Sequence, residues 1–208
     1  MPRPKKATDE EVFAAVHRAM TRVGAGELTL AHIADEAGVT PGALVQRFGS
    51  KRELMLRLYQ GMADWTTGMF AQLRAANRSP LAALRAYADC IAQMGEGPGG
   101  LAHHLGYLQI DLSDPAFHRH VKAQAQMTRR GIRELLDAAV AAGELRSSTD
   151  TASLARTVEA IVGGSLFAWA FYREGRTTDW VRQDLEAVVQ PYLVRAAGRR
   201  RTKARAGR

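Results

Sequence analysis

Three helix-start signals and one helix-stop signal crowd into the first quarter of the chain, and their spacing constrains the fold more than any other feature. Thr29, Thr40 and Ser50 can each cap a helix N-terminus, and Gly38 can adopt the left-handed conformation that ends a helix. Pro41 follows Thr40, in a first turn where its missing amide hydrogen is not needed. Helices this short bury little surface alone, so we expect them to cross closely and to pack on a third helix.

The rest of the chain repeats apolar residues at steps of three and four, which is the period of a helix with one buried face. No segment shows the alternating β-branched pattern of a strand. The sequence therefore predicts an all-α fold of about nine helices. They are expected near residues 8–23, 29–37, 40–48, 50–76, 79–94, 101–108, 114–143, 149–172 and 178–197. Pro191 lies inside the last of these helices and should kink or break it.

Charge is concentrated at the ends of the chain, which has 208 residues and a formal net charge of +8. Residues 1–52 carry eight Lys and Arg against six Asp and Glu, and residues 195–208 carry seven basic residues and no acidic one. Basic ends on a nearly neutral body suit a polyanionic partner. The single cysteine, Cys90, excludes an intramolecular disulfide, and no stretch reaches the roughly 18 consecutive apolar residues of a membrane span. We expect a soluble, cytoplasmic protein with no membrane partner.

The helix that begins at Thr40 has the composition of a DNA recognition helix. The second helix of a helix-turn-helix enters the major groove by its N-terminal residues. Gly42 and Ala43 are small enough for a close approach to base edges. Gln46 can pair bidentately with adenine, and Arg47 can pair with guanine or phosphate. Backbone amides at the capped helix starts are suited to phosphate oxygens.

Residues 8–58 contain two specific motifs, Leu-Thr-Leu-Ala-His-Ile-Ala-Asp-Glu-Ala-Gly-Val and Thr-Pro-Gly-Ala-Leu-Val-Gln-Arg-Phe-Gly-Ser-Lys-Arg-Glu-Leu. They resemble those of the tetracycline-repressor (TetR) family of regulators. The resemblance implies an all-helical homodimer that binds a palindromic or near-palindromic DNA operator and that a small-molecule effector releases. By motif position, it implies DNA contacts from Thr29, Thr40, Gly42, Ala43, Val45, Gln46, Arg47 and Lys51.

Two positions depart from the family pattern. The family usually has an aromatic residue, commonly Tyr, at the position of Val45, and Lys is frequent at the position of Pro41. Both differences remove a phosphate contact. The remaining basic side chains should then contribute more to binding: Arg47, Lys51 and, in the N-terminal arm, Arg3, Lys5 and Lys6.

Three parts are expected along the chain. Residues 1–52 form a helix-turn-helix DNA-binding domain with a basic arm, residues 53–197 form a helical ligand-binding and dimerisation domain, and residues 198–208 form a disordered basic tail. The fourth helix is expected to run unbroken from Ser50, at the DNA, to Met69, so that a bound ligand would tilt one rigid element.

Large or adaptable side chains on the central helices could line a largely apolar ligand pocket with a few polar groups. The candidates are Trp65, Met69, Tyr87, Met94, His104 and Tyr107. The last two helices carry more apolar surface than one pair needs, which predicts a four-helix dimer interface. Its candidates are Val158, Val162, Gly163, Gly164, Leu166, Trp169, Leu185 and Val188.

Other functions are weighed against a ligand-responsive repressor. The stretch Gly95–Gly100 has the glycines of a phosphate loop, but no strand precedes it. His103, His104, His118 and His120 do not share a helix face, so we expect no metal and no cofactor. A regulator without a ligand stays open as an alternative. A helical enzyme lacks a catalytic constellation, and a non-specific DNA-coating protein would show steep salt dependence with little sequence preference.

Overall fold

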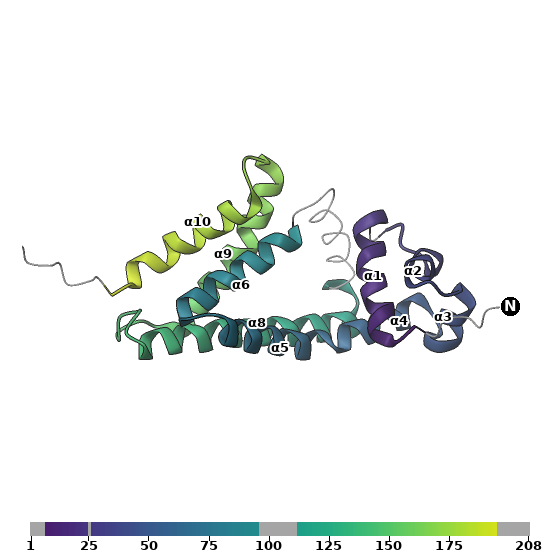
Figure 1. Cartoon of the computed structure of the whole chain (residues 1–208), viewed down its shortest axis with the longest axis horizontal. Helices are drawn as coiled ribbons and strands as arrows, with labels where there is room; N and C mark the ends of the chain where they lie inside the picture. Colours follow the sequence, from purple (N-terminus) through teal and green to yellow (C-terminus); the bar gives the residue numbers. More distant parts are fainter. Residues whose placement is uncertain (1–6, 25, 96–111, 195–208) are drawn as a thin grey trace, which may run out of the picture.

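The computed structural model describes residues 7–24, 26–95 and 112–194, which form an elongated helical molecule (Figure 1). The helices are α1 Asp9–Val23, α2 Leu30–Ala37, α3 Pro41–Phe48, α4 Lys51–Gln60, α5 Met62–Ala76, α6 Pro80–Gly95, α8 Pro115–Ala141, α9 Thr151–Tyr172 and α10 Thr177–Val189, with a 3-10 turn at Gln190–Tyr192. Within these residues the β-type pairing is one isolated bridge, between Leu145 and Leu193. The all-α prediction is confirmed. The helix expected at 101–108 and the tail expected at 198–208 lie outside the described residues.

Helices α1 to α4 form a head at one end of the molecule (Figure 1). Thr8 begins α1 with a capping box, in which its side chain accepts from the Glu11 amide and the Glu11 side chain accepts from the Thr8 amide. Ala34 of α2 is fully buried, and its small side chain allows α2 to cross α1 closely. The apolar side chains of the head core include Val12, Val16, Met20, Leu28, Ile33, Leu44, Phe48 and Leu54.

Gly61 divides the predicted fourth helix into α4 and α5. The Gly61 amide donates to the carbonyl of Leu58, three residues back, at 3.2 Å, instead of continuing the four-residue ladder. Gly61 itself keeps right-handed backbone angles, with φ −82° and ψ −10°, so the interruption is confined to this one residue. The expectation of one unbroken helix from Ser50 to Met69 is therefore wrong.

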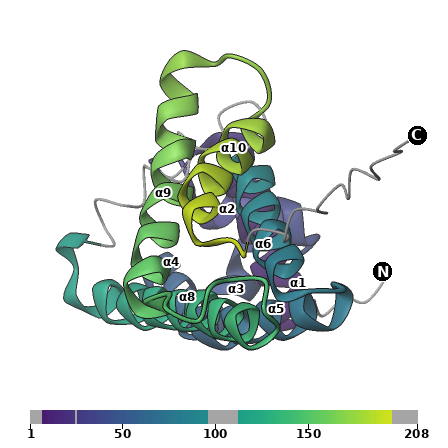
Figure 2. The ribbon, with the colours of Figure 1, turned by 90° about the vertical axis from the view of Figure 1, so that its left-hand side faces the viewer.

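The body is built on α5 and α8, which lie side by side along the length of the molecule (Figures 1 and 2). Helices α6 and α9 pack on α8, and α10 packs on α6 and α9. Gly131 of α8 allows the Phe70 ring of α5 to come close, since a Cβ at Gly131 would lie 2.3 Å from Cδ2 of Phe70. The same ring stacks on Tyr87 of α6 with 5.1 Å between centroids. These contacts bring α5, α6 and α8 together in one core.

The last helix is shorter than expected. Helix α10 ends at Val189, and Pro191 lies in the following 3-10 turn. Proline cannot donate the hydrogen bond that would continue the helix. The predicted break at Pro191 is confirmed, and the predicted continuation to about Ala197 is wrong for the described residues. The Arg146 amide donates to the Tyr192 carbonyl at 2.9 Å, which fastens this end to the turn between α8 and α9.

Helix α9 is long and apolar enough to cross a membrane by length and composition alone. Within the chain it packs against α8 and α10, and only about a third of its most apolar stretch is buried inside the molecule. Apolar side chains therefore lie on both the inward and the outward face of this helix.

Candidate nucleic-acid interface

A tight turn at Gly38 joins α2 to α3. Gly38 is left-handed, with φ 67° and ψ 34°, as predicted for the residue that ends α2. The Val39 amide donates to the Ala34 carbonyl at 3.0 Å, which satisfies the last turn of α2. This turn sets the angle between α2 and α3, and it requires the left-handed conformation that glycine adopts without strain.

The predicted caps are present at the starts of α2, α3 and α4. Thr29 accepts from the His32 amide at 3.2 Å, Thr40 from the Ala43 amide at 3.2 Å, and Ser50 from the Glu53 amide at 3.1 Å. A helix leaves its first amides without intrahelical partners, and a cap satisfies only part of them. The starts of α2, α3 and α4 therefore present backbone dipoles that suit anionic oxygens.

The residues predicted to contact DNA are all exposed on the head. They are Thr29, Thr40, Gly42, Ala43, Val45, Gln46, Arg47 and Lys51. Val45 is 48% exposed although its side chain is apolar. Among the described residues, a Cβ at Gly42 would meet no atom within 4 Å. The outer face of α3 thus carries small and partly apolar side chains, and such a surface can approach the methyl group of thymine.

Arg47 is directed to the start of α1. Its guanidinium forms an ion pair with the Asp9 carboxylate and donates to the Ala7 carbonyl. The guanidinium carbon also lies 5.3 Å from the centroid of the Phe48 ring. The guanidinium thus makes two contacts within the head, and the predicted pairing of Arg47 with guanine or phosphate stays a prediction.

Lys51 also bridges two elements of the head. Its Nζ donates to the Leu28 carbonyl at 2.8 Å, which joins the start of α4 to the segment before α2. An ammonium group has three donors, and the Lys51 side chain is exposed. It can therefore keep this bond and still bind a phosphate oxygen.

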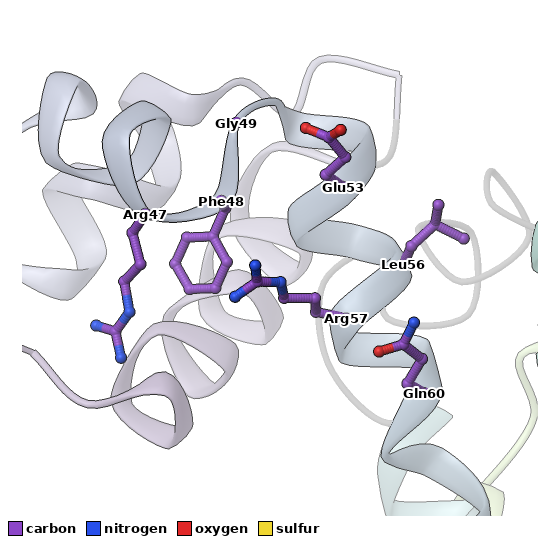
Figure 3. A pocket seen from close by; sticks show the side chains of 7 residues that line it. All are labelled: Arg47, Phe48, Gly49, Glu53, Leu56, Arg57 and Gln60. Atoms are coloured by element: carbon purple, nitrogen blue, oxygen red, sulfur yellow. The ribbon is translucent and has the colours of Figure 1, made fainter.

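A surface hollow of about 440 Å³ lies beside the end of α3 (Figure 3). It is lined by Arg47, Phe48, Gly49, Glu53, Leu56, Arg57 and Gln60. The Arg57 guanidinium carbon lies 5.3 Å from the Phe48 centroid, so this ring contacts two cations. The hollow is a feature of the head surface, and none of the described candidate pocket residues lines it.

The three candidate pocket residues that the structure describes differ in their exposure. Tyr87 is only 4% exposed and stacks on Phe70, and burial raises the pKa of its hydroxyl well above the usual value. It is a core residue. Trp65 is 55% exposed, and Met69, one turn later on α5, is partly buried against the core. The side chain of Met94, and all of His104 and Tyr107, lie outside the described residues.

The candidate dimer residues divide into two groups. Val158, Val162, Leu166 and Leu185 are buried in the core of their own chain, and their assignment to an interface stays a prediction. Helix periodicity could not separate these cases because α9 is apolar on both faces. Trp169 and Val188 are partly buried, as is Gly163, whereas Gly164 is exposed. The exposed face of α9 continues through two residues that the sequence analysis missed, Phe167 and Phe171, which are 40% and 85% exposed.

The head and the body meet where α4 contacts the start of α8. The Tyr59 and Phe117 rings lie edge to face with 5.0 Å between centroids. Arg52 pairs with Asp114 at 2.8 Å, and this hydrogen bond is the main reason that the pKa of Asp114 lies below its usual value. Phe117 belongs to the head core although it lies on α8. Packing therefore continues past the boundary expected at residue 52.

Two of these contacts had only partial signals in the sequence. Asp114 begins the helix expected at 114–143 and caps it by accepting from the Ala116 amide at 2.9 Å, but its pairing with Arg52 joins positions 62 residues apart. Asp9 reads as an ordinary acidic residue of a first helical turn. Its partner, Arg47, becomes apparent only once α1 and α3 are packed together.

Two family profiles match the chain. The profile described as "Bacterial regulatory proteins, tetR family" matches residues 12–58, and the one described as "Tetracyclin repressor-like, C-terminal domain" matches residues 105–185. Together they cover more than half of the chain. A comparison with curated protein sequences found no match.

Three solved structures illustrate the likeness of fold. A TetR transcription regulator from Haloarcula marismortui has a TM-score of 0.74 at 18% identity, over 89% of this chain and 98% of that one. E. coli NemR in its reduced form has a TM-score of 0.71 at 17% identity, over 91% and 99%. SmeT, the repressor of the Stenotrophomonas maltophilia multidrug efflux pump SmeDEF, has a TM-score of 0.66 at 20% identity, over 92% and 93%. With both family profiles matched and a helix-turn-helix in its head, the chain belongs to the TetR family of transcriptional regulators.

Proposed function

We propose that the protein is a homodimeric repressor that binds a palindromic or near-palindromic operator and is released from it by a small, largely apolar ligand. The observation that carries the proposal is the exposure of all the candidate contact residues on one head, around the start of α3. A repressor of this kind acts in the cytoplasm and performs no catalytic step.

The candidate contacts have different roles in this proposal. Gln46, exposed on α3, reads a base edge, whereas Lys51, at the start of α4, binds phosphate. Gln46→Ala should relax the preference at one base position at a cost of about 1–3 kcal/mol. Lys51→Ala should weaken all sequences alike and reduce the salt slope by about 1. If Gln46→Ala binds every operator variant with the same relative affinity as the parent, Gln46 does not read a base.

The experiment that tests DNA recognition is selection of duplexes from a random pool by the full chain, followed by titration at several salt concentrations. A repressor should enrich one inverted repeat and discriminate against other sequences by a factor of at least about 10³. Equal binding of all sequences, with a steep salt dependence, would indicate non-specific coating instead.

Dimerisation is proposed through the exposed face of α9. Gly164, Phe167 and Phe171 follow one another at helical spacing on that face, and a Cβ at Gly164 would meet no described atom within 4 Å. An uncovered glycine beside exposed aromatic rings allows a second helix to approach closely. Two heads held in this way could reach major grooves about 34 Å apart.

The ligand is proposed to contact the exposed side of α5. Trp65 and Met69 are four residues apart, so they share one helix face, and the Trp65 indole is a large apolar surface that is 55% exposed. Trp65→Ala should lower the response to ligand while leaving ligand-free operator binding nearly intact. Outright loss of operator binding would place Trp65 among the structural residues.

Helix α8 offers the route from ligand to DNA, because the α4–α5 junction at Gly61 is not one rigid helix. Its first turn carries Phe117, which packs in the head core, and its later turns carry Ile132 and Leu136, which are buried in the body core. A shift of α8 would therefore move both cores. Movement of α4 in one subunit relative to α4 in the other would misplace the two recognition helices on the operator. The coupling free energy between ligand binding and DNA binding should then be about 1–3 kcal/mol.

A further inference from the structure

Val45 places an apolar side chain on the outer face of α3. It is 48% exposed, and within the described head it is the only large apolar residue whose side chain is exposed to this degree. Leu44 and Phe48 occupy the inner face of the same helix and are buried in the head core. The isopropyl group of Val45 adds little to that core, so it is available to pack against a bound molecule.

Gly42 leaves room for such a contact. Gly42, Val45 and Gln46 lie three and four residues apart, so they share one face of α3. A Cβ at Gly42 would meet no described atom within 4 Å, so no described side chain covers this part of the helix. Because Gly42 has no side chain of its own, the helix backbone can come close to the floor of a groove. The methyl groups of Val45 can then reach the base edges.

The chemistry of the major groove leaves one group that an apolar side chain can contact favourably. Guanine presents two acceptors there, cytosine presents a donor, and adenine presents an acceptor and a donor. Thymine presents an acceptor and its 5-methyl group, which is the only apolar group on the edges of the four bases. The side chain of Val45 has neither a donor nor an acceptor, so it cannot form a hydrogen bond with a phosphate or a polar base edge.

We propose that Val45 reads the 5-methyl group of a thymine in each half of the operator, close to the base with which Gln46 pairs. This inference rests on the proposed operator binding and adds to it the chemistry of one operator position. Loss of one buried methyl group from such a contact lowers affinity by about fourfold. The contact involves no charge, so it does not contribute to the salt dependence of binding.

Deoxyuridine tests the contact directly, because it pairs as thymidine does and lacks only the 5-methyl group. The probe is a duplex that the full-length parent selects from a random pool. Each thymine position is changed to deoxyuridine in both half-sites, one position at a time, and affinity is measured at fixed salt. At one position the parent should lose about fifteenfold in affinity, which is about fourfold for each half-site. Val45→Ala should lose most of this difference between the two duplexes.

Gln46→Ala is the matched control, because Gln46 lies next to Val45 and is proposed to read its base by hydrogen bonds instead. This variant should keep the difference between thymine and deoxyuridine at the position that Val45 reads, and it should lose the preference at a different position. Because Val45 is exposed and alanine has the higher helix propensity, Val45→Ala should fold as the parent does, and thermal unfolding checks this. The salt slope of Val45→Ala should equal that of the parent, whereas Lys51→Ala should lower it.

Two results would overturn the inference. A deoxyuridine effect of the same size in the parent and in Val45→Ala would come from the shape of the DNA or from another residue. Equal binding of all the deoxyuridine duplexes by the parent would show that no methyl group is read. A pool from which the parent enriches no sequence would refute the proposed function, and this inference with it. Enrichment of an operator in which no deoxyuridine effect depends on residue 45 refutes the inference alone.

Discussion

Gly131 should tolerate no side chain, although it lies inside a helix where alanine is normally preferred. An ideal Cβ at this position would lie 2.3, 2.5 and 2.6 Å from three atoms of the Phe70 ring. Carbon atoms in contact are normally 3.5–4.0 Å apart, so the ring would have to move by about 1 Å. Phe70 is 1% exposed and stacks on Tyr87, so it has no free space to enter.

The expected magnitude follows from two opposing terms. Overpacking a well-filled core costs roughly 1–3 kcal/mol, and contacts this short, to a buried ring, point to the upper end. Replacing glycine by alanine inside a helix returns about 1 kcal/mol. Gly131→Ala should therefore lower the free energy of unfolding by about 2 kcal/mol.

Gly68→Ala on α5 provides the control, since its added Cβ meets no described atom within 4 Å. It should raise the free energy of unfolding by up to about 1 kcal/mol. Urea unfolding at one fixed protein concentration measures both changes, because the stability of an oligomer depends on concentration. Phe70→Leu should cost less in the Gly131→Ala background than in the parent. Equal stabilisation by Gly131→Ala and Gly68→Ala would refute the reasoning.

Three further predictions concern assembly, acid stability and the contact between head and body. Gly164→Leu should give monomers in analytical ultracentrifugation, whereas Gly68→Leu should sediment as the parent does; a dimeric Gly164→Leu protein would exclude this face. The pKa of Glu186 lies below its usual value, chiefly because Arg85 donates to it, so the pair stabilises the fold above that usual value and the stabilisation is lost as pH falls through the lowered one. Below about pH 5, the melting temperature should thus fall more steeply with pH for the parent than for Glu186→Gln. Parallel curves of melting temperature against pH would contradict this prediction. Phe117→Ala should speed amide hydrogen exchange in α4 and leave exchange in α10 unchanged. Unaltered exchange in α4 would show that α4 is not coupled to α8 through this ring.

Local features of this fold could be predicted from the sequence, and long-range ones could not. The caps at Thr29 and Thr40 involve residues three positions apart, so the chain itself brings the groups together. The turn at Gly38 depends on the conformation of one residue. Gly61 was missed because a glycine inside a helix costs only about 1 kcal/mol and the apolar period continues on both sides of it.

The candidate site was predictable in its surface but not in its contacts. Exposure of Gln46 and Val45 follows from the period of a short helix whose other face is buried. The partner of Arg47 could not be predicted, because Asp9 lies on another helix and many acidic residues were equally available. The sequence also could not show whether Val162 is buried within its own chain, because burial in the chain and burial in a dimer produce the same spacing of apolar residues.

The placement of Phe117 in the head core bears on the construction of hybrid regulators. A fusion that takes residues 1–60 from this chain and a body from a relative would remove one ring of the Tyr59–Phe117 pair and the Asp114 partner of Arg52. The foreign body would then have to supply an aromatic and an acidic residue at the matching turn of its own helix. Without them, loss of the buried phenyl group alone would cost about 3–5 kcal/mol. Exchange of DNA specificity between such proteins should therefore succeed more often by replacing the exposed residues of α3 than by moving the whole head.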